Sequence, residues 1–230
     1  MNMFDKSLKI GIITYDHNHL KTEQLIEPLF QVGYHIAIYA LPFYKRPARE
    51  VIFSHRPDQN HAEHPAVIAD RLGIEYIRCS DDSEIDNSCD YYLIAGAGIL
   101  SAKCLEKKKI INCHPGLIPF ARGLDSFKWA IYDLLPVGNT LHFIDYHVDA
   151  GEIIYQKITP VFCSDTIEEF ASRHYKLEIQ MMLNFESYLQ VPHQLSLPYG
   201  ERAVHRRMPK EIEIEMLENF EKYKHKFAQS

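Results

Sequence analysis

The fold is decided by the stretch Ile110–Gly151, which reads IINCHPGLIPFARGLDSFKWAIYDLLPVGNTLHFIDYHVDAG. The stretch begins with two β-branched residues, Ile110 and Ile111, which predict a buried strand. This strand is predicted to end after His114, because Pro115-Gly116 is typical of a turn. Side chains alternate along a strand, so Asn112 and His114 are predicted on one side and Cys113 on the other. Two polar groups therefore lie at the carboxyl end of a strand, where open α/β sheets bind their ligands.

Strand and helix patterns alternate on the N-terminal side of this stretch. Short apolar runs predict strands, and apolar residues with helical spacing predict helices that end at glycines. The strands are predicted at residues 9–15, 35–41, 51–57, 74–79 and 91–95, and the helices at 20–30, 64–72 and 101–109, with loops at 42–50 and 80–88. This order indicates a mostly parallel, doubly wound α/β sheet of Rossmann type with right-handed crossovers.

The C-terminal side of the stretch continues the sheet and then changes character. Asp125 is predicted to cap a helix that runs to Leu135, strands follow at 139–144 and 152–161, and Asp165 or Thr166 starts a long helix. The remainder is more polar and ends in a charged helix from Pro209. We expect a main domain over residues 1–190 and a small appendage over 191–230, whose role as a dimer contact, a lid or both the sequence leaves open.

Composition excludes several classes of protein. Lys and Arg number 25 against 31 Asp and Glu, giving a net charge of -6, whereas a nucleic-acid binder usually carries the opposite sign. No stretch approaches the ~18 apolar residues of a membrane span, and the N-terminus shows no signal-peptide pattern, so we expect a cytoplasmic protein with no nucleic-acid or membrane partner. The five cysteines form no CxxC pair, which disfavours disulfides and thiolate zinc.

Two further patterns are weak. Gly96-Ala97-Gly98 lacks the third glycine of a dinucleotide fingerprint, so a Rossmann oxidoreductase is disfavoured. His17-x-His19 and His61-x-x-His64 match no metal-binding spacing with a carboxylate or thiolate partner, and no metal is expected. His17, Asn18 and His19 follow the first strand, and we predict them as polar lining of a substrate pocket.

Four motifs follow one another in this part of the chain. They are Asn112-x-His114-Pro115-Gly116-Leu117-Ile118-Pro119, then Arg122-Gly123, then Thr140-Leu141-His142, and then Asp149-x-Gly151. Together they resemble the formyltransferase family that uses 10-formyltetrahydrofolate. The similarity covers roughly residues 9–185 and is weak before residue 90. Gly116 stands where many members carry Ser, a change that we expect to matter little.

The resemblance implies a role for each motif. Asn112, His114 and Asp149 would be catalytic, and 10-formyltetrahydrofolate would be the co-substrate. His142 would be a substrate-side group or a support behind one, and it could also simply sit on a half-buried strand. The folate-binding residues would be Gly96, Gly98, Ile99, Leu100, Asp145, His147 and Val148, and the substrate-binding residues His17, Asn18, His19, Arg122, Gly123 and His142.

These roles agree with the chemistry of the side chains. An amine that attacks a formyl carbon builds negative charge on the formyl oxygen, and fixed hydrogen-bond donors stabilise that oxyanion. The Asn112 amide and a protonated His114 are such donors on one strand face. Asp149 is the carboxylate expected to favour the imidazolium and to relay the amine's proton through water.

The acceptor amine is less defined. Methionyl-tRNA formyltransferases carry a further barrel domain, and glycinamide ribonucleotide transformylase has a glycine-rich first turn that this chain replaces with residues 14–19. Residues 117–135 look more like the formyltransferases of amino sugars, so a nucleotide-linked amino sugar of a surface polysaccharide or pseudaminic acid type pathway is expected. Alternatives are a glycinamide ribonucleotide transformylase-like enzyme, a formyltetrahydrofolate hydrolase and a non-catalytic folate-binding protein. A homodimer is left open.

Overall fold

A computed structural model describes residues 7–45, 47, 49–106 and 108–229 of the chain. Its centre is a seven-stranded sheet in the order β3-β2-β1-β4-β5-β6-β7. The first five strands of that order are parallel, and β6 and β7 add antiparallel pairs at one side. The predicted doubly wound, mostly parallel sheet is confirmed. The strands are β1 Lys9–Tyr15, β2 His35–Leu41, β3 Glu75–Arg78, β4 Tyr91–Ile94, β5 Ile110–His114, β6 Gly138–Phe143 and β7 Ile153–Ile158.

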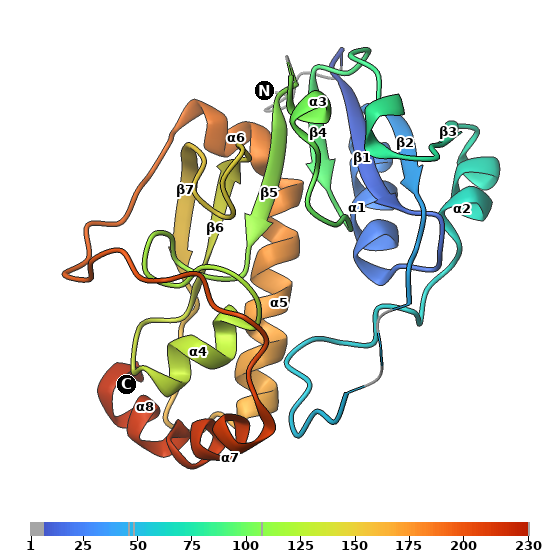
Figure 1. The fold of residues 1–230 in the computed structure, drawn as a ribbon. Coiled ribbons are helices and arrows are strands. Elements are labelled where there is room, and N and C mark those ends of the chain that lie inside the picture. The colour runs from blue at the N-terminus through green and yellow to red at the C-terminus, as the bar shows by residue number, and fades with distance from the viewer. Residues whose placement is uncertain (1–6, 46, 48, 107, 230) are drawn as a thin grey trace.

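Helices cover both faces of the sheet (Figure 1). On one face, α1 and α5 pack against side chains such as Ile12, Ile111 and Cys113. The opposite face carries Ile13, Tyr39 and other side chains that alternate with the first set. The helices are α1 Leu20–Val32, α2 Pro65–Leu72, α3 Ala102–Leu105, α4 Ser126–Tyr132, α5 Ile167–Leu183, α6 Phe185–Gln190, α7 Lys210–Glu218 and α8 Phe220–Phe227, with a 3-10 turn at Asp82–Glu84.

The helix boundaries follow local backbone chemistry. Gly33 and Gly73 end α1 and α2 in the left-handed conformation, at φ 105° and 65°, which glycine adopts without steric cost. Thr166 starts α5 in a capping box with Glu169. These three boundaries confirm the predictions. The helix predicted at 101–109 is confined to Ala102–Leu105, and its Lys107, like Arg46 and Ala48 of the predicted basic loop, lies outside the described residues.

The strand predicted at residues 51–57 is wrong. The segment joins no sheet, although its apolar residues suggested a strand. The backbone N–H of Ile52 instead donates to Glu213 Oε2 at 2.7 Å, and Phe53 is buried beside Phe127. Phe53 is buried against α4 and the C-terminal helices, whereas Val51 and Ile52 stay 42% and 41% exposed, so the segment needs no strand partner.

Asp125 also differs from its predicted role. It precedes α4, but its carboxylate makes no cap bond to that helix. Its Oδ2 accepts hydrogen bonds from the Met208 backbone at 3.0 Å and from Arg49 at 3.1 Å. The carboxylate therefore joins the start of α4 to two distant segments, which its local sequence does not reveal.

The C-terminal residues share a core with the main sheet's helices. Met208, Met216, Phe220 and Tyr223 are buried among side chains of α4 and α5. Residues 199–208, which we call the C-terminal strap, cross below the ends of β5 and β6 before α7 (Figure 1). The division of the chain at residue 191 stays a prediction about domain organisation. No helix in the described part of the chain has the length and apolar character needed to span a bilayer.

Candidate active site

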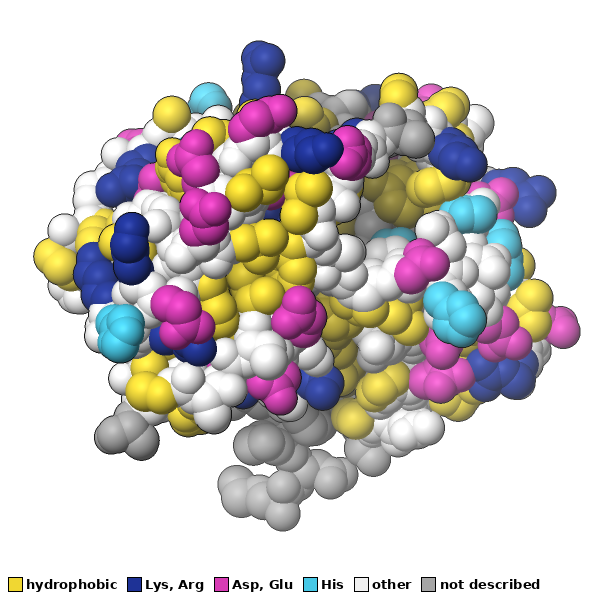
Figure 2. All heavy atoms as spheres, turned by 90° about the horizontal axis from the view of Figure 1, so that it is seen from below, with side chains coloured by type: hydrophobic (Ala, Val, Ile, Leu, Met, Phe, Trp, Pro, Cys, Tyr) yellow, Lys and Arg dark blue, Asp and Glu magenta, His cyan; other side chains and the backbone are white. Residues whose placement is uncertain are grey.

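The predicted site residues gather where the parallel strands end. β1, β4 and β5 finish at the same edge of the sheet, and the loops that follow them extend beyond it. β6 runs antiparallel to β5, and the loop after β6 brings Asp149 back beside His114. Figure 2 looks at the molecule from this side and shows a hollow to the right of the centre, with histidine side chains near its rim. This is the edge at which open α/β sheets place ligands.

His114 is the most constrained side chain of the site. It ends β5 and is 3% exposed. Its Nε2 lies 2.8 Å from the Ala121 carbonyl oxygen and 3.1 Å from Ser126 Oγ, and its Nδ1 lies 3.3 Å from Asp149 Oδ1. A carbonyl oxygen only accepts, so Nε2 carries a hydrogen. Because Nδ1 faces a carboxylate, only the imidazolium form donates to both neighbours.

Gly116 makes this arrangement possible. A Cβ atom at this position would lie 2.2 Å from the Ala121 carbonyl oxygen and 2.7 Å from His114 Nε2. Those two atoms form the hydrogen bond that fixes the imidazole. The expectation that glycine in place of serine matters little is therefore wrong for this backbone, because no side chain fits without moving the bond.

Asn112 and His142 face each other across β5 and β6. Asn112 Nδ2 lies 3.5 Å from His142 Nε2, and His142 Nδ1 donates to the Phe143 carbonyl at 3.0 Å. Burial, and then the nearby charge of His114, lower the pKa of His142 to about 4. A neutral His142 accepts at Nε2 and so orients the Asn112 amide, which leaves the second amide hydrogen for another acceptor.

Asp149 is held by the backbone around it. Its φ of 48° is left-handed, an uncommon conformation for a residue with a side chain. Its Oδ2 accepts the Gly123 N–H at 2.9 Å while Oδ1 faces His114. Asp149 therefore contacts His114 directly, while Asn112 lies two residues before His114 on β5 and contacts His142; the chemical roles of the three stay a prediction.

Arg122 lies beside this group but uses its guanidinium inside the protein. Nε and Nη2 donate to the Val148 carbonyl at 3.3 and 2.9 Å, and Nη1 lies 2.6 Å from Glu201 Oε1. The residue is 9% exposed. The Gly123 N–H donates to Asp149, and substrate binding by Arg122 and Gly123 stays a prediction.

The loop after β4 carries the predicted folate-binding glycines. A Cβ on Gly96 would meet the rings of Tyr15 and His19 at 2.8 and 2.9 Å, whereas the space around Gly98 is open. Ile99 is 90% exposed and Leu100 packs partly against the core. The loop therefore presents open space at Gly98 and the exposed side chain of Ile99.

The loop after β6 carries the other predicted folate-binding residues. Asp145, His147 and Val148 are exposed, and Asp145 Oδ1 accepts the His147 N–H at 2.8 Å. Val148 contributes its carbonyl to Arg122 and leaves its side chain 43% exposed. Folate binding by these residues stays a prediction.

The three polar residues after β1 have different environments. The His17 ring stacks on Phe43 with centroids 4.3 Å apart. Asn18 Nδ2 donates to the Ala62 carbonyl at 2.8 Å, which ties its side chain to a neighbouring loop. Burial, followed by the charge of Lys21, lowers the pKa of His19 to about 4, so this ring is neutral near pH 7. Substrate contact by this trio stays a prediction.

Sequence reasoning missed three residues that support the site. Ser126 Oγ donates to the Gly123 carbonyl at 2.7 Å and lies beside His114 Nε2. Thr140 Oγ1 donates to the Gly116 carbonyl at 2.7 Å, and Gln156 Nε2 lies 3.1 Å from that hydroxyl. Thr140 belongs to one of the four sequence motifs, so the sequence could have indicated it. Gln156 reaches the turn at Gly116 only because β7 pairs with β6.

Within the described ranges, no group of three or more His, Cys, Asp or Glu side chains is arranged to hold a metal ion. The site is therefore described by its organic side chains and backbone groups.

Comparison with known proteins connects this geometry to a family. Residues 86–185 match the family described as Formyl transferase. Phosphoribosylglycinamide formyltransferase of Haemophilus influenzae is 35% identical over an alignment of 115 residues. The match covers 44% of this chain and 54% of that protein. The trifunctional purine biosynthetic protein adenosine-3 of Chironomus tentans is 34% identical over 97 residues, 39% of this chain and 7% of that protein. The chain spans less than two thirds of either relative.

Solved structures agree on the fold. Phosphoribosylglycinamide formyltransferase from Anaplasma phagocytophilum has a TM-score of 0.56 and 25% identity, and the alignment covers 77% of this chain and 83% of that one. A sugar N-formyltransferase from a Shewanella species has a TM-score of 0.61 and 19% identity, with 92% and 87% covered. The family match contains Asn112, His114 and Asp149. The chain is therefore similar to formyl transferases over residues 86–185, which carry the three side chains of the site.

Proposed function

We propose that the protein is an N-formyltransferase that moves a formyl group from 10-formyltetrahydrofolate to the primary amine of a small substrate. The observation that carries the proposal is the convergence of His114 with Asp149 at 3.3 Å, beside Asn112 on the same strand face. The exposed Ile99 and Val148, with open space at Gly98, provide the apolar edges that a pterin ring fits.

Each group has a role in the transfer. The amine nitrogen bonds to the formyl carbon, and the bond from that carbon to the folate nitrogen breaks. The Asn112 amide donates a hydrogen bond to the oxyanion that forms between these events, and the His114 imidazolium, whose two N–H groups face Ala121 and Asp149, stabilises it by its positive charge. Asp149 stabilises the imidazolium, receives the proton that leaves the attacking amine, directly or through water, and returns it to the folate nitrogen as the bond to the formyl carbon breaks.

The start of α1 favours an amino sugar over glycinamide ribonucleotide. Leu20 N donates to the Gln59 carbonyl at 2.7 Å, and Lys21 N donates to Gln59 Oε1 at 3.2 Å. Helix N–H groups that bind a phosphate must be free to donate to it. Gln59 accepts from the N–H groups of both Leu20 and Lys21, and Asp16 adds a carboxylate shortly before them in the sequence. The N-terminal end of α1 is therefore a poor phosphate site.

A nucleotide-linked amino sugar is therefore our first choice of substrate. The fold likeness to the Shewanella sugar N-formyltransferase agrees with that choice. Glycinamide ribonucleotide is the second candidate, because the relatives in sequence include the 35% identical Haemophilus influenzae protein.

A substrate panel tests both candidates. The protein is incubated with 10-formyltetrahydrofolate and, separately, 4-amino sugar nucleotides, glycinamide ribonucleotide and methionyl-tRNA, and the N-formyl product is measured. We expect product with an amino sugar nucleotide. Product only with glycinamide ribonucleotide would replace the first candidate with the second. Formate release without any acceptor would identify a hydrolase, and folate binding without turnover a non-catalytic protein.

A further inference from the structure

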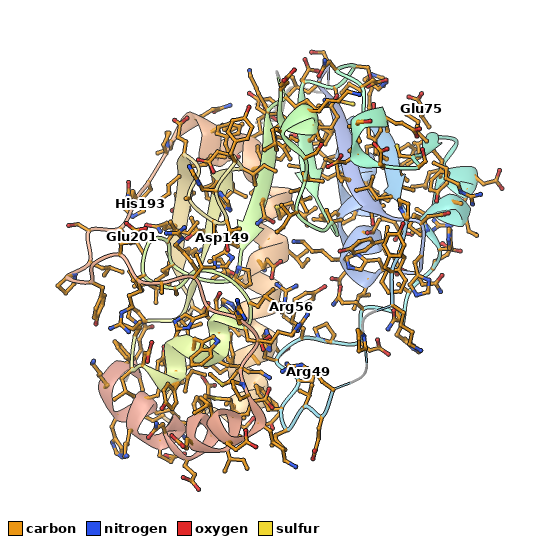
Figure 3. The ribbon with its side chains drawn as sticks, viewed as in Figure 1. Arg49, Arg56, Glu75, Asp149, His193 and Glu201 are labelled. Atoms are coloured by element: carbon orange, nitrogen blue, oxygen red, sulfur yellow. The ribbon has the colours of Figure 1, made fainter. Side chains whose placement is uncertain are left out.

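The C-terminal strap reaches the candidate active site through one ion pair. Glu201 of the strap lies 2.6 Å from Arg122 Nη1. Figure 3 labels Glu201 on the crossing segment and Asp149 on the loop behind the end of β5. Between them, Arg122 donates twice to the carbonyl of Val148, the residue before Asp149. A continuous chain of contacts therefore joins the strap to the catalytic carboxylate.

The backbone of the strap supports the same loop. His205 N donates to the Arg122 carbonyl at 3.0 Å, and Leu124 N donates to the His205 carbonyl at 3.0 Å. Gly123, which lies between these bonds, donates its own N–H to Asp149 Oδ2. A Cβ on Gly123 would lie 2.2 Å from the His205 carbonyl oxygen, so the strap is in direct contact with this turn.

The strap is itself anchored outside the site. The Trp129 ring stacks on His205 with centroids 4.4 Å apart, and its Nε1 donates to the Arg206 carbonyl at 2.8 Å. Arg202 pairs with Asp133 at 2.9 Å. The two Trp129 contacts fix the strap to α4, whereas the partly exposed Arg202–Asp133 pair adds little, so that Glu201 meets Arg122 from a supported position.

Asp149 needs such support because its backbone is in the left-handed region, which is strained for a residue with a side chain. A bidentate contact of a guanidinium with the preceding carbonyl restrains that conformation.

We propose that Arg122 and Glu201 are positioning residues that hold Asp149 against His114, and that the C-terminal strap is thereby a required part of the active site. The inference rests on the proposed formyl transfer for its kinetic test. Arg122 acts through the loop and does not bind the amine. A substrate contact would affect KM, whereas a misplaced Asp149 affects the chemical step.

The kinetic test uses Arg122→Lys, which keeps the charge but cannot donate from three nitrogens in a fixed plane. We expect kcat to fall about tenfold, with KM for the amine within about twofold of the parent. Glu201→Gln should lower kcat by about two- to fivefold, because Glu201 is largely exposed and exposed pairs contribute little. The double variant should lose less than the product of the two effects.

The matched control is Arg202→Gln, which breaks the strap's ion pair with Asp133 but touches neither Arg122 nor Val148. Its kcat should stay within about twofold of the parent. An increase in KM for the amine at unchanged kcat in Arg122→Lys would show that Arg122 binds substrate and would overturn the proposal.

A second readout does not depend on turnover. Amide hydrogen exchange at Gly123, whose N–H donates to Asp149, should become faster in Arg122→Lys and stay unchanged in Arg202→Gln. If the parent protein formylates no amine, the proposed function fails while this exchange measurement still decides the positioning role. Unchanged exchange at Gly123 in Arg122→Lys would refute it.

Discussion

Replacing Asp149 by Asn is the perturbation that bears most directly on the chemistry. Asparagine keeps the size of the side chain and an oxygen that can accept the Gly123 N–H. It removes the negative charge beside His114. The variant should therefore fold like the parent and lose the stabilisation that the carboxylate gives to the imidazolium and to the departing proton.

The size of the effect follows from the geometry. His114 Nδ1 and Asp149 Oδ1 are 3.3 Å apart, with side chains 4% and 13% exposed. Two unit charges at that separation interact by about 5 kcal/mol at an effective dielectric constant of about 20. Solvent and local rearrangement offset part of this interaction energy. The remaining loss of transition-state stabilisation should be close to the roughly 2.7–4 kcal/mol that removal of one oxyanion donor costs. We expect kcat to fall about 10²- to 10³-fold.

The assay measures kcat and both KM values with 10-formyltetrahydrofolate and the amine identified in the panel. Glu152→Gln is the matched control, because it removes one carboxylate charge from an exposed side chain three positions along the same loop. Its kcat should stay within about twofold of the parent. If Asp149→Asn keeps kcat within about threefold of the parent, the carboxylate is not part of the chemical step.

Three further predictions concern stability. Gly116→Ala should lower the free energy of unfolding by about 1–3 kcal/mol and reduce kcat, because its Cβ would overlap the Ala121 carbonyl; unchanged urea unfolding and turnover would contradict this. Burial lowers the pKa of His174 from 6.5 to about 4. Between these two pH values the unfolded chain binds a proton at His174 that the folded protein does not, so the protein loses stability as the pH falls. The parent's free energy of unfolding should therefore fall between about pH 7 and about pH 5, and His174→Gln should make this fall about 2 kcal/mol smaller. An equal fall in the parent and in His174→Gln would count against a neutral buried His174. Glu213→Gln should destabilise the protein by about 3–5 kcal/mol, because it leaves Lys128 buried without its charged partner, and chemical unfolding within about 1 kcal/mol of the parent would show that the pair contributes little.

Local patterns were sufficient to predict the sheet. The alternation at Asn112, Cys113 and His114 depends only on strand geometry, and Cys113 packs against α5 while His114 faces the site. Gly33 and Gly73 end helices for reasons contained within one turn of chain. Such features need no knowledge of distant residues, and this is why they were correct.

The errors share a dependence on distant residues. Of the apolar residues at 51–53 only Phe53 is buried, and it packs in the cluster of α4 and the C-terminal helices and not in a strand. The Asp125 carboxylate accepts from Met208 instead of capping α4. The contacts of Arg122 with Val148 and Glu201 could not be predicted either, because these residues lie 26 and 79 positions away in sequence. Gly116 was undervalued because its crowding comes from the Ala121 carbonyl, which only the folded turn brings close.

Transfer of an isotopically labelled formyl group tests the central claim most directly. 10-Formyltetrahydrofolate carrying a ¹³C formyl carbon is incubated with the protein and an amino sugar nucleotide, and the products are read by mass spectrometry. The account predicts the label in an N-formyl sugar product with the parent protein, and about 10² times less of it per unit time with Asp149→Asn. Label recovered only as formate, or equal transfer by both proteins, would contradict it.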